Sequence, residues 1–154
     1  MSTSGASGMD KKDRIRKYGE VFTPQNIVNQ MCDSLQKEAP ECWEIEKTFL
    51  EPCCGEGVFV LEILRRKFER CVSRKDYTAA LRSVWAMDIQ ERNVDATIAN
   101  VCVLCQKHFN PTKEEYQIIS DHVILCDSLK IMRMMHELNA KEEPDGQHES
   151  DTVP

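Results

Sequence analysis

A glycine-rich turn that opens with an acidic residue is the segment of this chain best suited to bind a ligand. The run Glu51-Pro52-Cys53-Cys54-Gly55-Glu56-Gly57 lies between a short apolar segment and a stretch with helical periodicity at 60–68. Proteins of the α/β class hold nucleoside-containing cofactors where a strand ends and a helix begins. Gly55 and Gly57 have no Cβ, so a ligand can approach their backbone closely. Glu51 would repel a pyrophosphate but suits a cationic amino group or a sugar hydroxyl, which favours S-adenosylmethionine over NAD.

Two further acidic residues stand where strands are expected to end. Asp88 follows the apolar run 84–87, and Asp127 follows the apolar segment 122–126. In an open parallel sheet, ligands bind outside the carboxyl ends of the strands. Asp88 is therefore expected to accept hydrogen bonds from both ribose hydroxyls. Asp127 is expected to accept one from the exocyclic amine of an adenine ring.

Neighbouring residues are expected to complete the cofactor site. Phe22 and Ile89 are candidates to sandwich the adenine, and Ser128 and Leu129 follow the adenine-binding acid. The backbone amides around Gly57 can hold the methionine carboxylate. No catalytic or metal-binding residue is assigned.

Each of these features has a simpler structural interpretation. Glu51 could cap a helix, and the two glycines could serve only a tight turn. Asp88 and Asp127 could cap the helices that follow them, and Phe22 could belong to the core.

The elements that position these residues alternate between strands and helices. Strands are expected at 48–51, 83–88 and 122–126, and residues 37–47 are expected to form a loop. Thr23 is a plausible N-cap and Pro24 a plausible first helical residue. Helices are expected at 11–17, from Pro24 through Leu35, and at 60–68, 76–82, 91–109, 113–118 and 130–138. This alternation predicts an α/β fold whose parallel strands are linked by right-handed crossovers.

Apolar periodicity also predicts which side chains are buried. The run 84–87 is typical of a strand that is buried on both faces. The first long helix is expected to bury a stripe, and the helix at 60–68 to expose a basic face that is solvated rather than bound to DNA. The buried stripe of the first long helix consists of Ile27, Val28, Met31 and Leu35, and the basic face consists of Arg65, Arg66 and Lys67.

Length and composition limit the class of protein. At 154 residues the chain is one domain, expected at 11–139 between a disordered segment at 1–10 and a disordered acidic tail at 140–154. A net charge of −6 does not suggest a protein that coats nucleic acid, although the basic cluster at 11–17 could reach a phosphate.

No secretory signal or membrane-length apolar run is visible, so we expect a cytoplasmic protein with no membrane partner. The eight cysteines are expected to be reduced, and the Cys102–Cys105 pair to be small core side chains rather than metal ligands.

Four segments together resemble the adenine-N6 DNA methyltransferases, including modification subunits of type I and fused type II restriction systems and short phage-borne relatives. The match spans about 18–129. It consists of Gly19-Glu20-Val21-Phe22-Thr23-Pro24, Glu51-Pro52-Cys53-Cys54-Gly55-Glu56-Gly57, Ala86-Met87-Asp88-Ile89 and Cys126-Asp127-Ser128-Leu129. The resemblance implies a partial Rossmann-like, class I S-adenosylmethionine-dependent methyltransferase fold. It also implies that Phe22, Thr23 and Pro24 lie against the methionine part of the cofactor.

The Asn-Pro-Pro-Tyr or Asp-Pro-Pro-Tyr turn of that family is not found in the sequence. Asn110-Pro111 continues as Thr112-Lys113 and precedes Asp127 rather than following it. In the family, this turn binds the amine of a flipped adenine. Strand 48–51 would then lie at a sheet edge, so we expect a second copy or a complementing catalytic or target-recognition chain to cover it.

Two classes of function remain open at this point. The first is the cofactor module of a DNA methyltransferase that contacts DNA through a complex. The second is a non-catalytic cofactor-binding regulator or decoy, or the product of a truncated methyltransferase gene.

Overall fold

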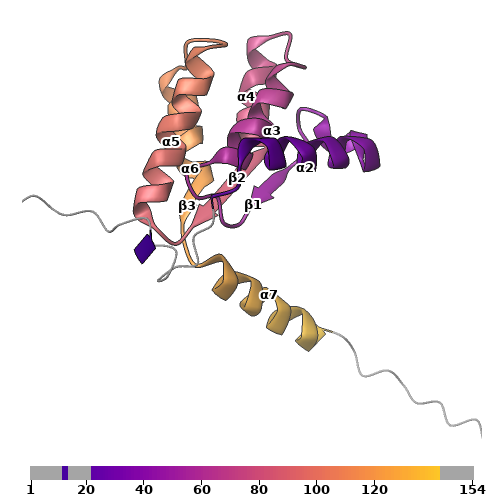
Figure 1. Ribbon diagram of the computed structural model, residues 1–154, viewed down its shortest axis with the longest axis vertical. Coiled ribbons are helices and arrows are strands. Elements are labelled where there is room, and N and C mark those ends of the chain that lie inside the picture. The colour runs from indigo at the N-terminus through magenta and orange to yellow at the C-terminus, as the bar shows by residue number, and fades with distance from the viewer. Residues whose placement is uncertain (1–11, 14–21, 143–154) are drawn as a thin grey trace, which may run out of the picture.

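The computed structural model describes residues 12–13 and 22–142 (Figure 1). The expected helix at 11–17 is described only at 12–13. Residues 19–21 of the first motif, residues 1–10 and most of the expected tail lie outside the described residues. The elements are α2 Gln25–Glu38, η1 Pro40–Trp43, β1 Phe49–Glu51, α3 Val58–Phe68, α4 Arg74–Arg82, β2 Val84–Asp88, α5 Glu91–Gln106, α6 Lys113–His122, β3 Val123–Leu125 and α7 Ser128–Glu142.

The three strands form a parallel sheet in the order β1-β2-β3, so the expected α/β class is confirmed. The register pairs Phe49 with Val84 and Ala86 with Val123. Successive strands are added in one direction, so right-handed crossovers place the connecting helices on a single face. Helices α3, α4, α5 and α6 all contact β2. The arrangement is compatible with part of a Rossmann-like fold, with β1 at an edge of the described sheet as expected.

The prediction that 84–87 is buried on both faces is wrong. Val84 and Ala86 point into the core, whereas Trp85 is only half-buried. Leu50 pairs with Trp85 in the sheet and is 53% exposed. With Met87 and Ile124, these two residues form what we call the open sheet face. The strand-linking helices pack mainly on the opposite side, and the His122 ring at the end of α6 stacks on Trp85, so this face is partly exposed within the described part of the chain.

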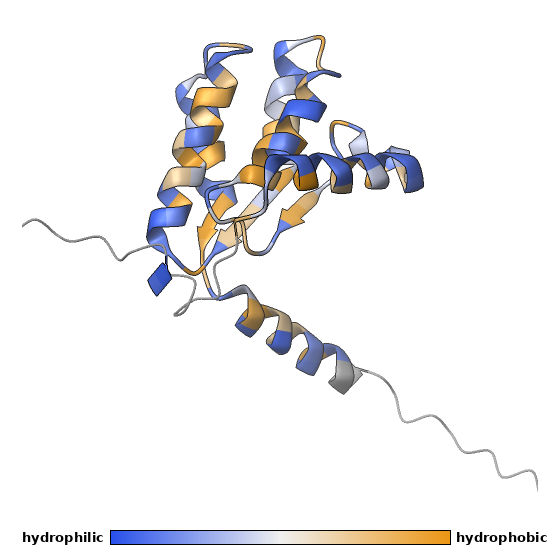
Figure 2. Ribbon diagram, viewed as in Figure 1, coloured by the Kyte–Doolittle hydropathy of each residue, from blue (hydrophilic) through white to orange (hydrophobic). Residues whose placement is uncertain are grey.

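The core lies between the helices and the covered face of the sheet. Leu64 and Phe68 of α3 and Val101 and Cys105 of α5 are almost completely buried there. Apolar segments of α3 and α5 can be followed in Figure 2. Trp43 of η1 is fully buried, with its ring centroid 5.2 Å from that of Phe49. The 3₁₀ turn therefore occupies part of the segment 37–47 that was expected to be a loop.

Local capping explains where two of the helices begin. Ser73 and Asp76 form a capping box, so α4 begins at Arg74, two residues before the expected start. Thr112 and Glu115 form another at α6, whose start was expected correctly. Pro24 rather than Thr23 is the cap residue of α2, without a side-chain hydrogen bond, so that cap prediction is wrong.

The ends of four helices also differ from expectation, and α2 runs on to Glu38 rather than ending near Leu35. Helix α5 ends at Gln106 rather than at 109, because the N–H groups of His108 and Phe109 close the last turn on the Cys105 carbonyl, at 2.8 Å each. Helix α6 runs on to His122, whose ring stacks on Trp85 at a centroid distance of 3.7 Å. Helix α7 continues to Glu142, so residues 140–142 are helical rather than part of the tail.

Lys67 was expected to be exposed and is instead fully buried. Its ammonium donates hydrogen bonds to the carbonyl oxygens of Glu44 at 2.8 Å, Ile45 at 2.9 Å and Lys47 at 2.7 Å. Burial lowers the pKa of Lys67 to about 8, while the three acceptors favour the charged form. The side chain ties the segment before β1 to α3, which holds the start of the glycine turn in place.

Several apolar side chains have no cover within the described residues. Ile27 and Met31, expected to be buried, are 38% and 54% exposed, whereas Val28 and Cys32 form the buried stripe of α2. Helix α7 projects away from the other helices (Figures 1 and 2). It exposes an i, i+3, i+4, i+7 stripe of Ile131, Met134, Met135 and Leu138. None of the described helices is long and apolar enough to cross a membrane.

Candidate functional site

The carboxyl ends of the three strands meet at one edge of the sheet. Beyond β1, the Cys54 N–H donates to the Met87 carbonyl of β2 at 2.8 Å. Beyond β3, the Cys126 N–H donates to the Asp88 carbonyl at 2.9 Å. The Gly55 N–H donates to the Asp88 carboxylate at 2.9 Å. The glycine turn and the acid at the end of β2 are therefore in direct contact.

The two glycines of the turn have different surroundings. Both have positive φ, +54° at Gly55 and +90° at Gly57, which L side chains rarely adopt. A Cβ at Gly55 would meet nothing within 4 Å, so this residue faces open space. A Cβ at Gly57 would lie 2.9 Å from Thr97 Cγ2, because the turn packs tightly against α5 there. Gly55 is thus the glycine whose backbone a ligand can approach.

The Asp88 carboxylate already has three hydrogen-bond donors. Its Oδ1 accepts from the Gln90 N–H at 2.8 Å and from Asn93 Nδ2 at 3.1 Å, and its Oδ2 accepts from Gly55. A carboxylate offers about four acceptor sites, so about one remains free in this arrangement. Asp88 is 8% exposed. Binding two ribose hydroxyls would require at least one of the present donors to move, and the ribose role stays a prediction.

The acidic start of the turn is organised by its own backbone. Glu51 is half-buried, and its Oε1 accepts a hydrogen bond from the Cys53 N–H at 3.0 Å. Pro52 is half-buried and Cys53 exposed. The Cys53 thiol lies 3.7 Å from the hydroxyl of Ser128, which is 6% exposed. This contact brings the segment after β1 to the segment after β3, across the end of β2.

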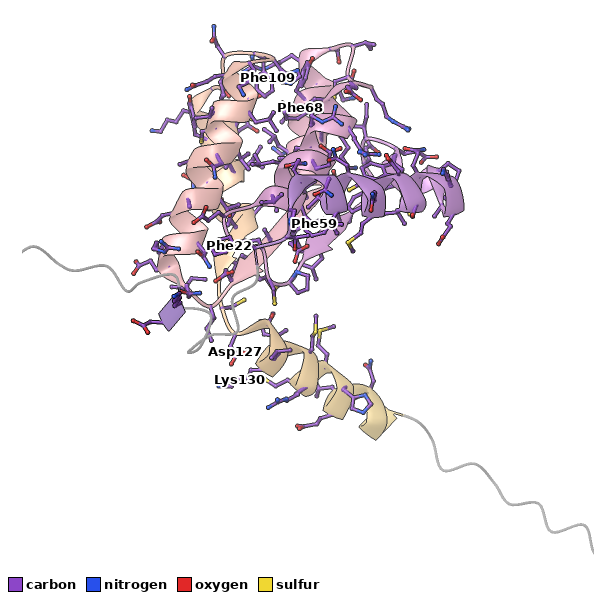
Figure 3. The ribbon with its side chains drawn as sticks, in the orientation of Figure 1. Phe22, Phe59, Phe68, Phe109, Asp127 and Lys130 are labelled. Atoms are coloured by element: carbon purple, nitrogen blue, oxygen red, sulfur yellow. The ribbon has the colours of Figure 1, made fainter. Side chains whose placement is uncertain are left out.

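Asp127 has the capping role that was considered as its alternative. Its Oδ1 accepts from the Lys130 N–H at 3.1 Å, which explains why α7 begins at Ser128 rather than at 130. Asp127 and Lys130 both lie at the start of this helix (Figure 3). Asp127 is exposed and Leu129 is 60% exposed. A contact between Asp127 and adenine stays a prediction, and the cap leaves Oδ2 available for it among the described residues.

The remaining expected cofactor contacts differ in how exposed their side chains are. Phe22 and Thr23 are half-buried in the segment that leads into α2, and Pro24 is exposed (Figure 3). Ile89, directly after Asp88, is 56% exposed. Ile89 has the free apolar surface that a stacked ring needs, whereas its pairing with Phe22 across an adenine stays a prediction.

Three polar residues of α5 contact the site and were missed in the sequence. Asn93 donates to Asp88, Thr97 Oγ1 donates to the Gly55 carbonyl at 3.0 Å, and Asn100 Nδ2 donates to the Glu56 carbonyl at 3.0 Å. Their spacing of four and three residues places them on one helical face. Asn93 and Thr97 are buried near Val94 and Val101 of the same helix. The signal that could have identified them is the presence of polar residues on the same helical face as buried apolar ones.

Cys54, in the turn, and Cys105, in the core, are buried cysteines. All eight cysteines are free thiols. Burial raises the pKa of Cys54 to about 11 and that of Cys105 to about 12. Among the residues that the structure describes, no group of three or more His, Cys, Asp or Glu side chains is arranged to hold a metal ion.

Comparison with known proteins relates the chain to a methyltransferase. It is 29% identical over 89 residues to the Type II methyltransferase M.VspI of Vibrio sp. (strain 343). The aligned part covers 58% of this chain and 18% of the relative. The chain therefore spans less than a fifth of the length of this relative. No family model matches, and no solved structure matches.

Proposed function

We propose that this chain is the S-adenosylmethionine-binding module of a DNA adenine-N6 methyltransferase of the restriction-modification or phage type. The observation that carries the proposal is the contact between the glycine turn and Asp88, with Ser128 beside the same turn. These segments come from three different strand ends, and an open α/β sheet binds ligands at such an edge. Similarity to a Type II methyltransferase supports the same reading.

The residues at this edge suit the chemical groups of that cofactor. When bound, S-adenosylmethionine supplies an electrophilic methyl group on its sulfonium. Glu51 presents a carboxylate beside the turn, suited to a cationic amino group, and Asp88 presents one suited to sugar hydroxyls. Gly55 lets the backbone come close to the ligand. The contribution of this chain is to bind and orient the cofactor, which accelerates transfer through proximity.

Isothermal titration calorimetry with S-adenosylmethionine tests the cofactor site. We expect the purified chain to bind, and Asp88→Asn to weaken binding by about tenfold or more, because charge-assisted hydrogen bonds are worth about 1.5–3 kcal/mol. Asp95→Asn is the matched control, since Asp95 is an exposed acid on α5. No binding at millimolar cofactor would refute the proposal.

Catalysis in this proposal depends on a complementing chain. Within the described residues, β1 has a free edge of unpaired backbone groups, and the open sheet face and the exposed stripe of α7 are apolar. A larger fold would cover all three. The occupant that fits all three is a polypeptide whose strand pairs with β1 and whose helices pack on the open sheet face. The same polypeptide would carry the Asn/Asp-Pro-Pro-Tyr turn, which this sequence does not contain.

Radiolabelled methyl transfer to DNA, measured with and without the products of neighbouring genes, tests this dependence. We expect incorporation only in the mixture, together with a rise in the thermal stability of this chain. Cofactor binding without methyl transfer in any mixture would instead favour a non-catalytic regulator or decoy. A second copy as the partner would appear as a dimer at micromolar concentration.

A further inference from the structure

We propose that the polar face of α5, and Thr97 above all, is a clamp that positions the glycine turn for the cofactor. The inference rests on the cofactor site proposed above and assigns a role to residues outside it. The clamp consists of Asn93, Thr97 and Asn100. None of them needs to touch the ligand, so they are positioning residues rather than cofactor contacts.

Thr97 touches three residues of the turn with one side chain. Its hydroxyl donates to the Gly55 carbonyl at 3.0 Å and lies 3.6 Å from the Cys54 thiol. Its methyl group occupies the space that a Cβ on Gly57 would need, at 2.9 Å. Thr97 is fully buried. The hydroxyl fixes one side of the turn while the methyl group fixes the other.

Asn93 and Asn100 extend the clamp one helical turn in each direction. Asn93 holds Asp88, and Asn100 holds the Glu56 carbonyl. Glu56 also forms an ion pair with Arg92 at 3.5 Å. One rigid helix therefore anchors both the turn after β1 and the acid after β2, which come from different strands.

The chemistry of position 97 argues for this role over simple core packing. Valine has nearly the shape of threonine and would fill a buried helical position without a polar group to satisfy. The threonine hydroxyl is useful there because it donates to the Gly55 carbonyl at 3.0 Å, to which the weakly donating Cys54 thiol also points at 3.6 Å. Holding the turn before the ligand arrives reduces the conformational entropy lost on binding.

The test combines ligand binding with a measurement that needs no ligand. Thr97→Val removes the hydroxyl and keeps the shape, and Thr97→Ser restores it. Thr78→Val is the matched control, because the Thr78 hydroxyl donates to Glu115 in α6, away from the turn. Asn100→Ala, at an exposed position, probes the clamp without disturbing the core. Calorimetry with S-adenosylmethionine and amide hydrogen exchange of residues 53–57 without it are measured on each variant.

We expect Thr97→Val to accelerate exchange of the turn amides and to weaken cofactor binding by up to about tenfold, because a turn without this hydrogen bond is in the binding conformation for a smaller fraction of the time. Thr97→Ser should return both values to near those of the wild type, Asn100→Ala should shift both in the same direction by less, and Thr78→Val should change neither. If the wild type binds the cofactor and Thr97→Val binds it equally well, the clamp is refuted but the cofactor site is not. The same conclusion follows if Thr78→Val weakens binding as much as Thr97→Val does. A wild-type chain that fails to bind would refute the proposed cofactor site as well.

Discussion

Replacing Lys67 with methionine should destabilise the fold by removing a buried cation from three carbonyl oxygens. The ammonium donates to Glu44, Ile45 and Lys47 at 2.7–2.9 Å. Methionine keeps the length and apolar character of the stem but offers no donor. The substitution therefore leaves three acceptors unpaired and creates little empty volume.

The magnitude follows from those acceptors. Leaving one buried acceptor unpaired costs about 1–3 kcal/mol. Glu44 and Lys47 are exposed residues, so water can reach part of the segment, and the low end of that range applies. The substitution also removes the free-energy cost of burying the Lys67 ammonium, which is a second reason to use the low end of the range. We expect a loss of about 3 kcal/mol, or about 6–12 °C in Tm for a chain of this size.

Thermal unfolding followed by circular dichroism, with urea titration as a second measure, checks this value. Lys37→Met is the matched control, because Lys37 is exposed in the last turn of α2 and should change stability by less than about 0.5 kcal/mol. A Lys67→Met protein as stable as the wild type would show that charge burial costs as much as the three hydrogen bonds contribute. A more stable variant would refute the reasoning outright.

Two further substitutions test the acid that joins α4 to α6 and the tight turn. Burial raises the pKa of Glu115, but hydrogen bonds from Arg74, Thr112 and Thr78 outweigh it and lower the pKa from 4.5 to about 2. Its stabilising contribution is therefore complete above pH 4.5 and is lost as the pH falls toward 2. The stability advantage of wild type over Glu115→Gln, measured by urea titration, should shrink over that window, and a constant difference would contradict this. Gly57→Ala should lower the free energy of unfolding by about 1–3 kcal/mol more than Gly55→Ala. Both substitutions place a side chain at positive φ, but only the Cβ at position 57 would also overlap with Thr97. Equal losses of unfolding free energy would contradict the close packing of the turn.

Local patterns were sufficient to predict most elements and their order. The strands at 48–51, 83–88 and 122–126 each appear in the structure, within two residues at either end. Each is a short apolar segment followed by an acid or a turn, a signal contained in neighbouring residues. The glycine turn and Asp88 were likewise expected at one edge, because parallel strands with helical crossovers leave few other arrangements.

Burial of individual side chains depended on contacts that the local pattern does not contain. Lys67 is buried because a distant segment turns three carbonyl oxygens toward it. Trp85 and Met87 lie in a continuous apolar run, yet they are half-buried because the described helices pack mainly on the other face and only the His122 ring of α6 stacks on Trp85. Thr97 was not singled out in the sequence, since its partner is a backbone carbonyl more than forty residues away.

The order β1-β2-β3 has a consequence for how the chain folds. Each strand pairs with the next one in sequence, and the paired residues lie about 35 positions apart, as Phe49 and Val84 do. Every strand pairing is thus completed by residues 49–125, without waiting for any later segment. Domains form from the N-terminus during synthesis, so these three strands can pair before any later residue has left the ribosome. In the proposed complex, the edge of β1 that is free within the described sheet would be the template for a strand of the complementing chain.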